Sequence, residues 1–388
     1  MRARVPAPVA SVRDWLREPS SRAAAIYLAV STTSAVVSAV VGSISEYSFP
    51  HPLVATQLHL VIALAALLAA GLTARLVLLK TTGRRALTGA DQPNAFAAAL
   101  SQLSAAVPSR PFFHYLSTAF EVLFATVAST LAAVLELFAQ RTVDPSFWAF
   151  ARLLPLPLSL SAASLSCNVA PGVTQLALST GLWLALVAGQ GVTAYSSGSN
   201  WLFALAWAAS SVGCVVALQA AQARGREAET GKFKPTELSQ WPARPPSLVI
   251  HLALSIILLT LPTLSSSEVT DIRRYRHYSF FAEPGFWAQE AVMALCGLAN
   301  LAATWHLAST TTPLALFSVV ALEDTLVLPR AFALLLGNPL DAVSQGEATL
   351  GAGQQAVVLG LLAGVWALGR ASGEATQRED VRGRRKEG

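Results

Sequence analysis

The stretch that decides the fold is SLVIHLALSIILLTLPTL, residues 247–264, which contains no Asp, Glu, Lys or Arg. A run of about 20 apolar residues is long enough to cross the hydrocarbon core of a bilayer as one α-helix. Similar runs recur on both sides of it, and 53% of the 388 residues are hydrophobic while only 13% are charged. Soluble domains carry about 25% charged residues. The chain is therefore predicted to be an all-α polytopic membrane protein.

The apolar runs predict about ten transmembrane helices. The expected spans are 22–43, 52–79, 112–140, 146–167, 173–195, 200–222, 247–264, 285–307, 312–336 and 353–370. The fourth span is interrupted by Pro155 and Pro157, which a membrane bundle tolerates when neighbouring helices satisfy the freed carbonyls.

The polar segments between the spans predict the domain organisation. The expected parts are an N-terminal tail (1–21), six helices (22–222), a linker (223–246), four helices (247–370) and a disordered polar tail (371–388). An equal division would fall after the fifth helix and give two five-helix halves. Many transporters are built from such inverted repeats, with the binding site where the halves meet.

The basic residues gather in both tails and in the loops after the second and sixth spans. This asymmetry is typical of cytosolic segments, so both termini are expected in the cytosol. The loop 265–284 departs from the rule, because it holds Arg273, Arg274 and Arg276. Basic loops beside apolar spans explain the pI of about 9.4 without nucleic acid.

The sequence contains no signature of a cofactor or metal site. The three cysteines, Cys167, Cys214 and Cys296, show no CxxC spacing, which argues against a zinc site or a disulfide framework. No nucleotide-binding P-loop, GxSxG or HExxH motif occurs. We therefore expect neither a cofactor nor a soluble-enzyme chemistry.

Charged side chains inside membrane spans are costly and are functional candidates by default. Those in the expected spans are Glu121, Glu136, Arg152, Glu290, Glu323, Asp324 and Arg330. Arg152 and Arg330 occupy equivalent helices if the repeats hold five helices each, and a guanidinium binds phosphate bidentately. We predict a substrate site formed by Arg152 and Arg330, with Glu323 and Asp324 as carboxylates that pair with the arginines when the carrier is empty.

Several of these residues have other interpretations. Glu136, Arg152 and Glu290 lie near enough to span ends to extend to the lipid headgroups, and Arg330 can form a structural pair with Glu323 on the same helical face. The scattered histidines are expected to be hydrogen-bonded packing residues rather than metal ligands; they are His59, His114, His251 and His306.

Four segments resemble the triose-phosphate and nucleotide-sugar transporter branch of the drug/metabolite transporter superfamily. PSFWAFARLLPLPLSL, residues 145–160, is similar to its fourth helix, and FPHPLVATQLHLVIALAAL, from Phe49, is similar to its second. The stretch from Asn300 to the Gly-Asn-Pro at 337–339 resembles helices 8 and 9. GQQAVVLGLLAGVWALGR resembles the last helix. The resemblance covers about residues 20–370.

This resemblance implies a ten-helix antiporter of phosphorylated sugars or nucleotide-sugars in Golgi or endoplasmic reticulum membranes, with the bilayer and a small anion as its partners. It leaves a homodimer open. Arg152 matches the family's basic residue in helix 4. The family's helix 9 lysine is replaced, since VALED stands there and Arg330 follows about two turns on.

Two further readings remain open beside the transporter. One is a membrane-embedded enzyme acting on a lipid or isoprenoid, with Glu121 or Glu290 as the acid and His114 two turns from Glu121. The other is a non-transporting relative that keeps the fold, as the replaced lysine indicates.

Overall fold

The computed structural model describes residues 19–44, 51–88, 100–101, 103–107, 112–142, 151, 154–156, 158–159, 198–229, 245–274, 279–311 and 315–320. These residues form helices and short connections, with no strand among them. The all-α class predicted from the sequence is therefore what the described part of the chain shows.

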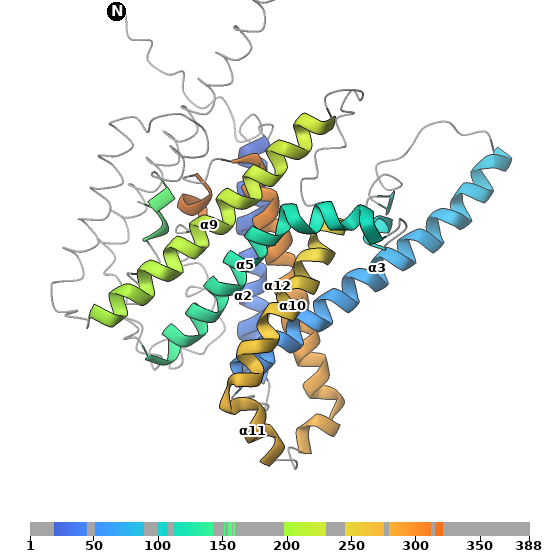
Figure 1. The fold of residues 1–388 in the computed structure, drawn as a ribbon. Coiled ribbons are helices and arrows are strands. Elements are labelled where there is room, and N and C mark those ends of the chain that lie inside the picture. Colours follow the sequence, from blue (N-terminus) through green and yellow to red (C-terminus); the bar gives the residue numbers. More distant parts are fainter. Residues whose placement is uncertain are drawn as a thin grey trace, which may run out of the picture.

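Six long helices make up this part (Figure 1). They are α2 (Pro19–Ile44), α3 (Pro52–Thr88), α5 (Phe112–Thr142), α9 (Gly198–Glu229), α10 (Pro245–Ser265) and α12 (Pro284–Thr310). Four of them begin at proline, whose fixed φ suits the first helical turn and whose missing N–H is not needed there. They correspond to the first, second, third, sixth, seventh and eighth expected spans.

Five segments of these helices are long and apolar enough to cross a membrane. They are Pro52–Lys80, Val122–Ala139, Trp201–Ala220, Pro246–Ser265 and Pro284–Thr310. The chain is thus an integral membrane protein by the length and composition of its helices. Two helices run past their apolar spans into polar sequence, α3 as far as Thr88 and α9 as far as Glu229, so α9 enters the expected linker. The fifth and tenth expected spans, and most of the fourth and ninth, lie outside the described residues.

The helices pack in a chain of neighbours. Helix α12 lies against α2, α3 and α9, whereas α10 lies against α3 and α5, and α5 lies against α9. Figure 1 shows the far end of α3 extending away from this group. The bundle therefore contains helices from distant parts of the sequence as direct neighbours.

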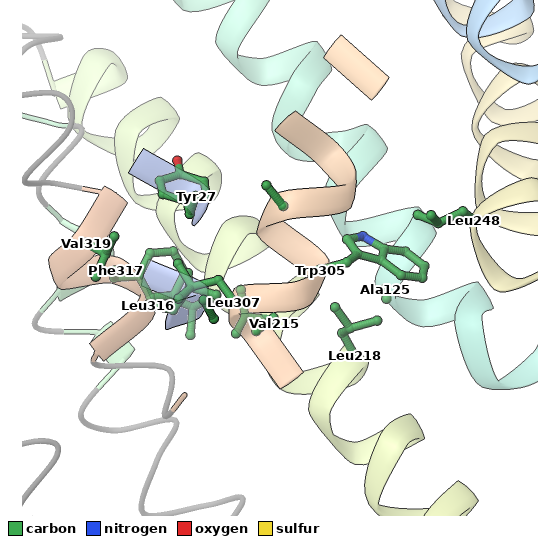
Figure 2. Packing of buried hydrophobic residues seen from close by; sticks show 14 of the residues in the cluster. Tyr27, Ala125, Val215, Leu218, Leu248, Trp305, Leu307, Leu316, Phe317 and Val319 are labelled. Atoms are coloured by element: carbon green, nitrogen blue, oxygen red, sulfur yellow. The ribbon is translucent and has the colours of Figure 1, made fainter. Parts of the chain in front are cut away.

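Small residues dominate the buried surface between the helices. Ala125 on α5 and Ala204 and Ala208 on α9 are fully buried. Small side chains let helix backbones approach closely, which drives packing where the lipid is as apolar as the core. Larger residues fill the space between them: Figure 2 shows Trp305 of α12 reaching toward Ala125 and Leu248.

Other large apolar side chains point outward. On α10, Ile257, Leu261 and Leu264 are 67%, 74% and 64% exposed, and their spacing of four and three residues places them on one face of the helix. On α5, Phe124 is 74% exposed. A soluble protein would bury these residues, whereas in a bilayer they contact the acyl chains.

The connection between α10 and α12 is not the plain loop expected from the sequence. It contains α11 (Ser267–Arg274) and a 3₁₀ turn, η2 (Ser279–Ala282). Helix α11 carries Glu268 in its first turn and Arg273 and Arg274 in its last, which suits the helix dipole at both ends. Its short length and polar sequence hid it from an interpretation based on apolar runs.

Candidate functional site

The start of α3 is held by an acidic residue from α11. Glu268 is buried, and its Oε2 accepts hydrogen bonds from the backbone N–H groups of Leu53 at 3.0 Å and Val54 at 3.1 Å. A carboxylate at a helix start satisfies N–H groups that have no partner within the helix and also suits the dipole. The start of α3 therefore lies at the end of α10, from which α11 follows directly.

Helices α3 and α10 are joined by a second polar contact. The Nε2 of Gln57 donates to Oγ1 of Thr260 at 2.9 Å, one turn or so into α3 and near the end of α10. Together with Glu268, this contact shows that the two helices run antiparallel. The start of α3 and the end of α10 lie on the same face of the bundle as α11 (Figure 1).

A histidine and a carboxylate meet between α3 and α12 just inside this face. His59 Nε2 lies 2.6 Å from Glu290 Oε2, and the side chains are 30% and 5% exposed. His59 follows Pro52 by seven residues and Glu290 follows Pro284 by six, which is about 10 Å along each helix at about 1.5 Å per residue. Two ionisable groups thus face each other inside membrane-spanning segments.

A second histidine joins α10 to α5. His251 Nδ1 lies 2.9 Å from Thr126 Oγ1, and both residues are buried. The Thr126 hydroxyl donates its single proton to the carbonyl of Val122 at 2.9 Å, so the imidazole N–H is the donor in the contact with His251. The ring of Trp305 packs edge-on against His251, with centroids 5.0 Å apart. This histidine therefore has a hydroxyl, not a carboxylate, as its partner.

A groove of about 440 Å³ lies between α2 and α12. On α12 it is lined by Val292, Leu295, Cys296 and Ala299, and on α2 by small residues that include Thr33 and Ser34. At about 100° per residue, the four α12 positions point roughly opposite to Glu290. The lining of this groove is mostly apolar, and the buried carboxylate of Glu290 points away from it.

The four residues predicted to bind substrate lie outside the described residues. They are Arg152, Arg330, Glu323 and Asp324. Their inward orientation and their pairing remain predictions. The side chains of Glu121 and His114 lie outside the described part as well, whereas Glu136 on α5 is half-buried. Within the described residues, no three His, Cys, Asp or Glu side chains gather as metal ligands.

Two interpretations of the sequence can be judged here. The alternative in which Glu290 extends to the headgroups is wrong, because its side chain is sealed between helices and paired with His59. The expectation that the histidines are hydrogen-bonded is confirmed for His59 and His251.

The sequence interpretation missed the partners of these residues. His59 and Glu290 are 231 positions apart, and only their shared occurrence in apolar runs was a signal. The role of Glu268 had no signal, since the residue lies in what was expected to be a loop.

No protein-family model matches the chain, and no curated protein matches it either.

Proposed function

We propose that this chain is a membrane carrier of small organic anions, namely phosphorylated sugars or nucleotide-sugars, which it exchanges by alternating access. The proposal includes about ten transmembrane helices in two inverted halves of five. Its support comes from the apolar helices, the loop charges, the motif resemblance and, above all, from which helices pack together.

The packing of the described helices is consistent with an exchange of two halves. The first half begins with α2, α3 and α5, and the second begins with α9, α10 and α12. In this exchange α2 corresponds to α9, α3 to α10 and α5 to α12. If each helix is replaced by its counterpart, the α2–α12 contact becomes α9–α5, and the α3–α12 contact becomes α10–α5. The α3–α10 contact maps onto itself. Every one of these five pairs is packed, whereas the smaller contacts α9–α12 and α3–α5 have no comparable counterparts in α2–α5 and α10–α12. This agreement is the observation that carries the proposal.

The two histidine contacts follow the same exchange. His59 lies near the start of α3 and reaches α12, whereas His251 lies near the start of α10 and reaches α5. Because α3 and α10 are antiparallel, the two contacts are displaced toward opposite faces of the bundle. Each one joins a helix of one half to a helix of the other.

Alternating access requires that the halves separate first on one face and then on the other, around a central site. We assign the His59–Glu290 contact to the gate on the face where α3 begins, and the His251–Thr126 contact to the gate toward the other face. Arg152 and Arg330 would bind the anion between the gates. With cytosolic termini, the His59–Glu290 gate faces the lumen of the Golgi or endoplasmic reticulum.

An enzyme acting on a lipid is less compatible with the described residues. Such an enzyme needs a pocket open to the bilayer on which carboxylates converge. The groove between α2 and α12 has an apolar lining, and Glu290 points to the opposite side of α12. In the proposed carrier, the carboxylate of Glu290 lies between the two halves.

The test is exchange in liposomes that contain the purified protein. Vesicles loaded with unlabelled sugar phosphates or nucleotide-sugars should take up the matching labelled compound, and vesicles without an internal anion should take up far less. An Arg152→Ala variant with an unchanged folded fraction should lose the exchange. Folded wild-type protein that exchanges no member of a broad anion panel contradicts the proposal.

A further inference from the structure

The carboxylate of Glu290 is the feature that the proposed function leaves unexplained, because a neutral hydrogen bond could close the same gate. We propose that His59 and Glu290 form a proton-binding site whose proton number changes when the gate between α3 and α12 opens and closes. This inference rests on the proposed carrier function and adds the coupling ion to it.

The number of protons on the pair decides how well it tolerates burial. With one proton, the pair is neutral overall, either as imidazolium with carboxylate or as imidazole with carboxylic acid, and one hydrogen bond links the two groups. With no proton or with two, a net charge of −1 or +1 remains between apolar helices. An uncompensated charge is costly there. Gain or loss of a proton therefore favours separation of α3 from α12 and entry of water.

The exposure of the two side chains gives the proton a route. Glu290 keeps 5% of its side chain exposed, whereas His59 keeps 30%. An imidazole can take a proton on one ring nitrogen and release one from the other. His59 is thus positioned to connect the sealed carboxylate with the surroundings of the gate.

Several other ionisable groups stand on the elements that surround this pair. Glu268 is bound to the start of α3, while Arg273 and Arg274 are exposed at the end of α11. His251, at the level of the other gate, has a hydroxyl as its partner. The remaining groups among the described residues of α2, α3, α5, α9, α11 and α12 and the residues next to them are Arg22, His51, Arg75, Lys80, Glu136, Cys214, Asp271, Glu283, Cys296 and His306.

The counterpart gate explains why one proton site is expected rather than two. His251 occupies the position in α10 that corresponds to His59 in α3, but Thr126 does not titrate in the pH range of the cell. The His251–Thr126 contact contains no carboxylate, so a proton added to His251 would leave an uncompensated positive charge between buried helices. Only the His59–Glu290 pair can bind one proton and stay neutral overall.

The first experiment measures proton binding without any substrate. Wild-type protein in liposomes is titrated with acid and base while the infrared carbonyl band of protonated carboxylic acids is recorded. One component of the titrating band should vanish in Glu290→Gln and persist in Glu283→Gln, whose carboxylate lies exposed at the start of the same helix. Identical titrations for wild type and Glu290→Gln overturn the proton site. Glu290→Asp, which retains a carboxyl group, should restore a titrating component if Glu290→Gln folds poorly.

The second experiment measures anion exchange at equal pH on both sides of the liposome. Across the titrating range, the wild-type rate should change by up to about tenfold per pH unit, the limit for a single proton. In Glu290→Gln only His59 of the pair can still bind a proton, so the pH profile of whatever rate remains should differ from that of the wild type, whereas Glu283→Gln should follow the wild type. An unaltered pH profile in Glu290→Gln overturns the coupling. If no anion is exchanged by the wild type, the carrier function fails, and the infrared titration alone decides the proton site.

Discussion

His59 of α3 and Glu290 of α12 lie 2.6 Å apart inside two membrane-spanning helices, with only 5% of the glutamate side chain exposed. Removing one member of a buried pair leaves a charge without compensation, which typically costs about 3–5 kcal/mol, whereas removing both is often tolerated. The contact therefore has a distinct signature in a double-mutant cycle.

We predict that His59→Leu and Glu290→Leu are each destabilising and that the double variant is more stable than either. The expected loss for each single variant is about 3 kcal/mol, at the lower end because His59 is partly exposed. Reversible unfolding in detergent micelles measures the three free energies of unfolding. Strictly additive effects would contradict a direct interaction between the two side chains.

Glu268 provides a second test of how the helices are joined. Replacement by Ala removes the acceptor for the N–H groups of Leu53 and Val54, and we expect a loss of about 1–3 kcal/mol in the free energy of unfolding. Glu268→Gln keeps one acceptor oxygen and should lose less. If Glu268→Ala unfolds like the wild type, α11 does not hold the start of α3.

Gly71 is expected to be intolerant of a methyl group. A Cβ at this position would lie 3.0 Å from the Cβ of Ala106 and 3.0 Å from the carbonyl oxygen of Leu103. Such overpacking typically costs about 1–3 kcal/mol, so Gly71→Ala should lower the thermal midpoint.

Gly213 is the matched control for Gly71. Nothing lies within 4 Å of a Cβ built there, and alanine is favoured over glycine in a helix by about 1 kcal/mol. Gly213→Ala should therefore be neutral or stabilising. The same loss of stability in both variants would contradict the close approach at Gly71.

The orientation in the membrane can be measured by labelling single cysteines in a background without Cys167, Cys214 and Cys296. Thr270 on α11 and Lys80 on α3 are exposed and belong to opposite faces in the proposed topology. In sealed microsomes, a membrane-impermeant maleimide should label Lys80→Cys directly and Thr270→Cys only after permeabilisation. Labelling of both sites without permeabilisation would place the two positions on one face.

Much of the described fold could be predicted from hydrophobic runs. The expected span 52–79 matches the apolar part of α3, Pro52–Lys80, and the expected span 285–307 lies within α12, Pro284–Thr310. An apolar run of this length is stable only in a bilayer or in a large protein core, so the position of the run predicts the position of the helix. Helix α11 was missed because eight polar residues give no such signal.

The candidate site was less accessible from the sequence. A charge inside a membrane span is costly, which made Glu290 a candidate. The same cost is compatible with a side chain that extends to the membrane surface and with one that is buried in a pair with another residue. Which of these holds depends on the partner, and His59 is separated from Glu290 by most of the chain. Pairing across such distances is set by helix packing, which the pattern of one helix does not contain. The arginines chosen as the anion site lie outside the described residues.

The central claim is that two halves of the protein move against each other to carry an anion, and reversible cross-linking during exchange tests it most directly. Gln57 and Thr260 join α3 to α10, and Thr130 and Ser255 join α5 to α10, so each pair spans the two proposed halves. Cysteines at either pair, linked by a short cleavable thiol reagent in anion-loaded liposomes, should stop exchange, and reduction should restore it. Exchange that continues unchanged with both pairs fully linked, or a reduced protein that exchanges no anion at all, would contradict the account.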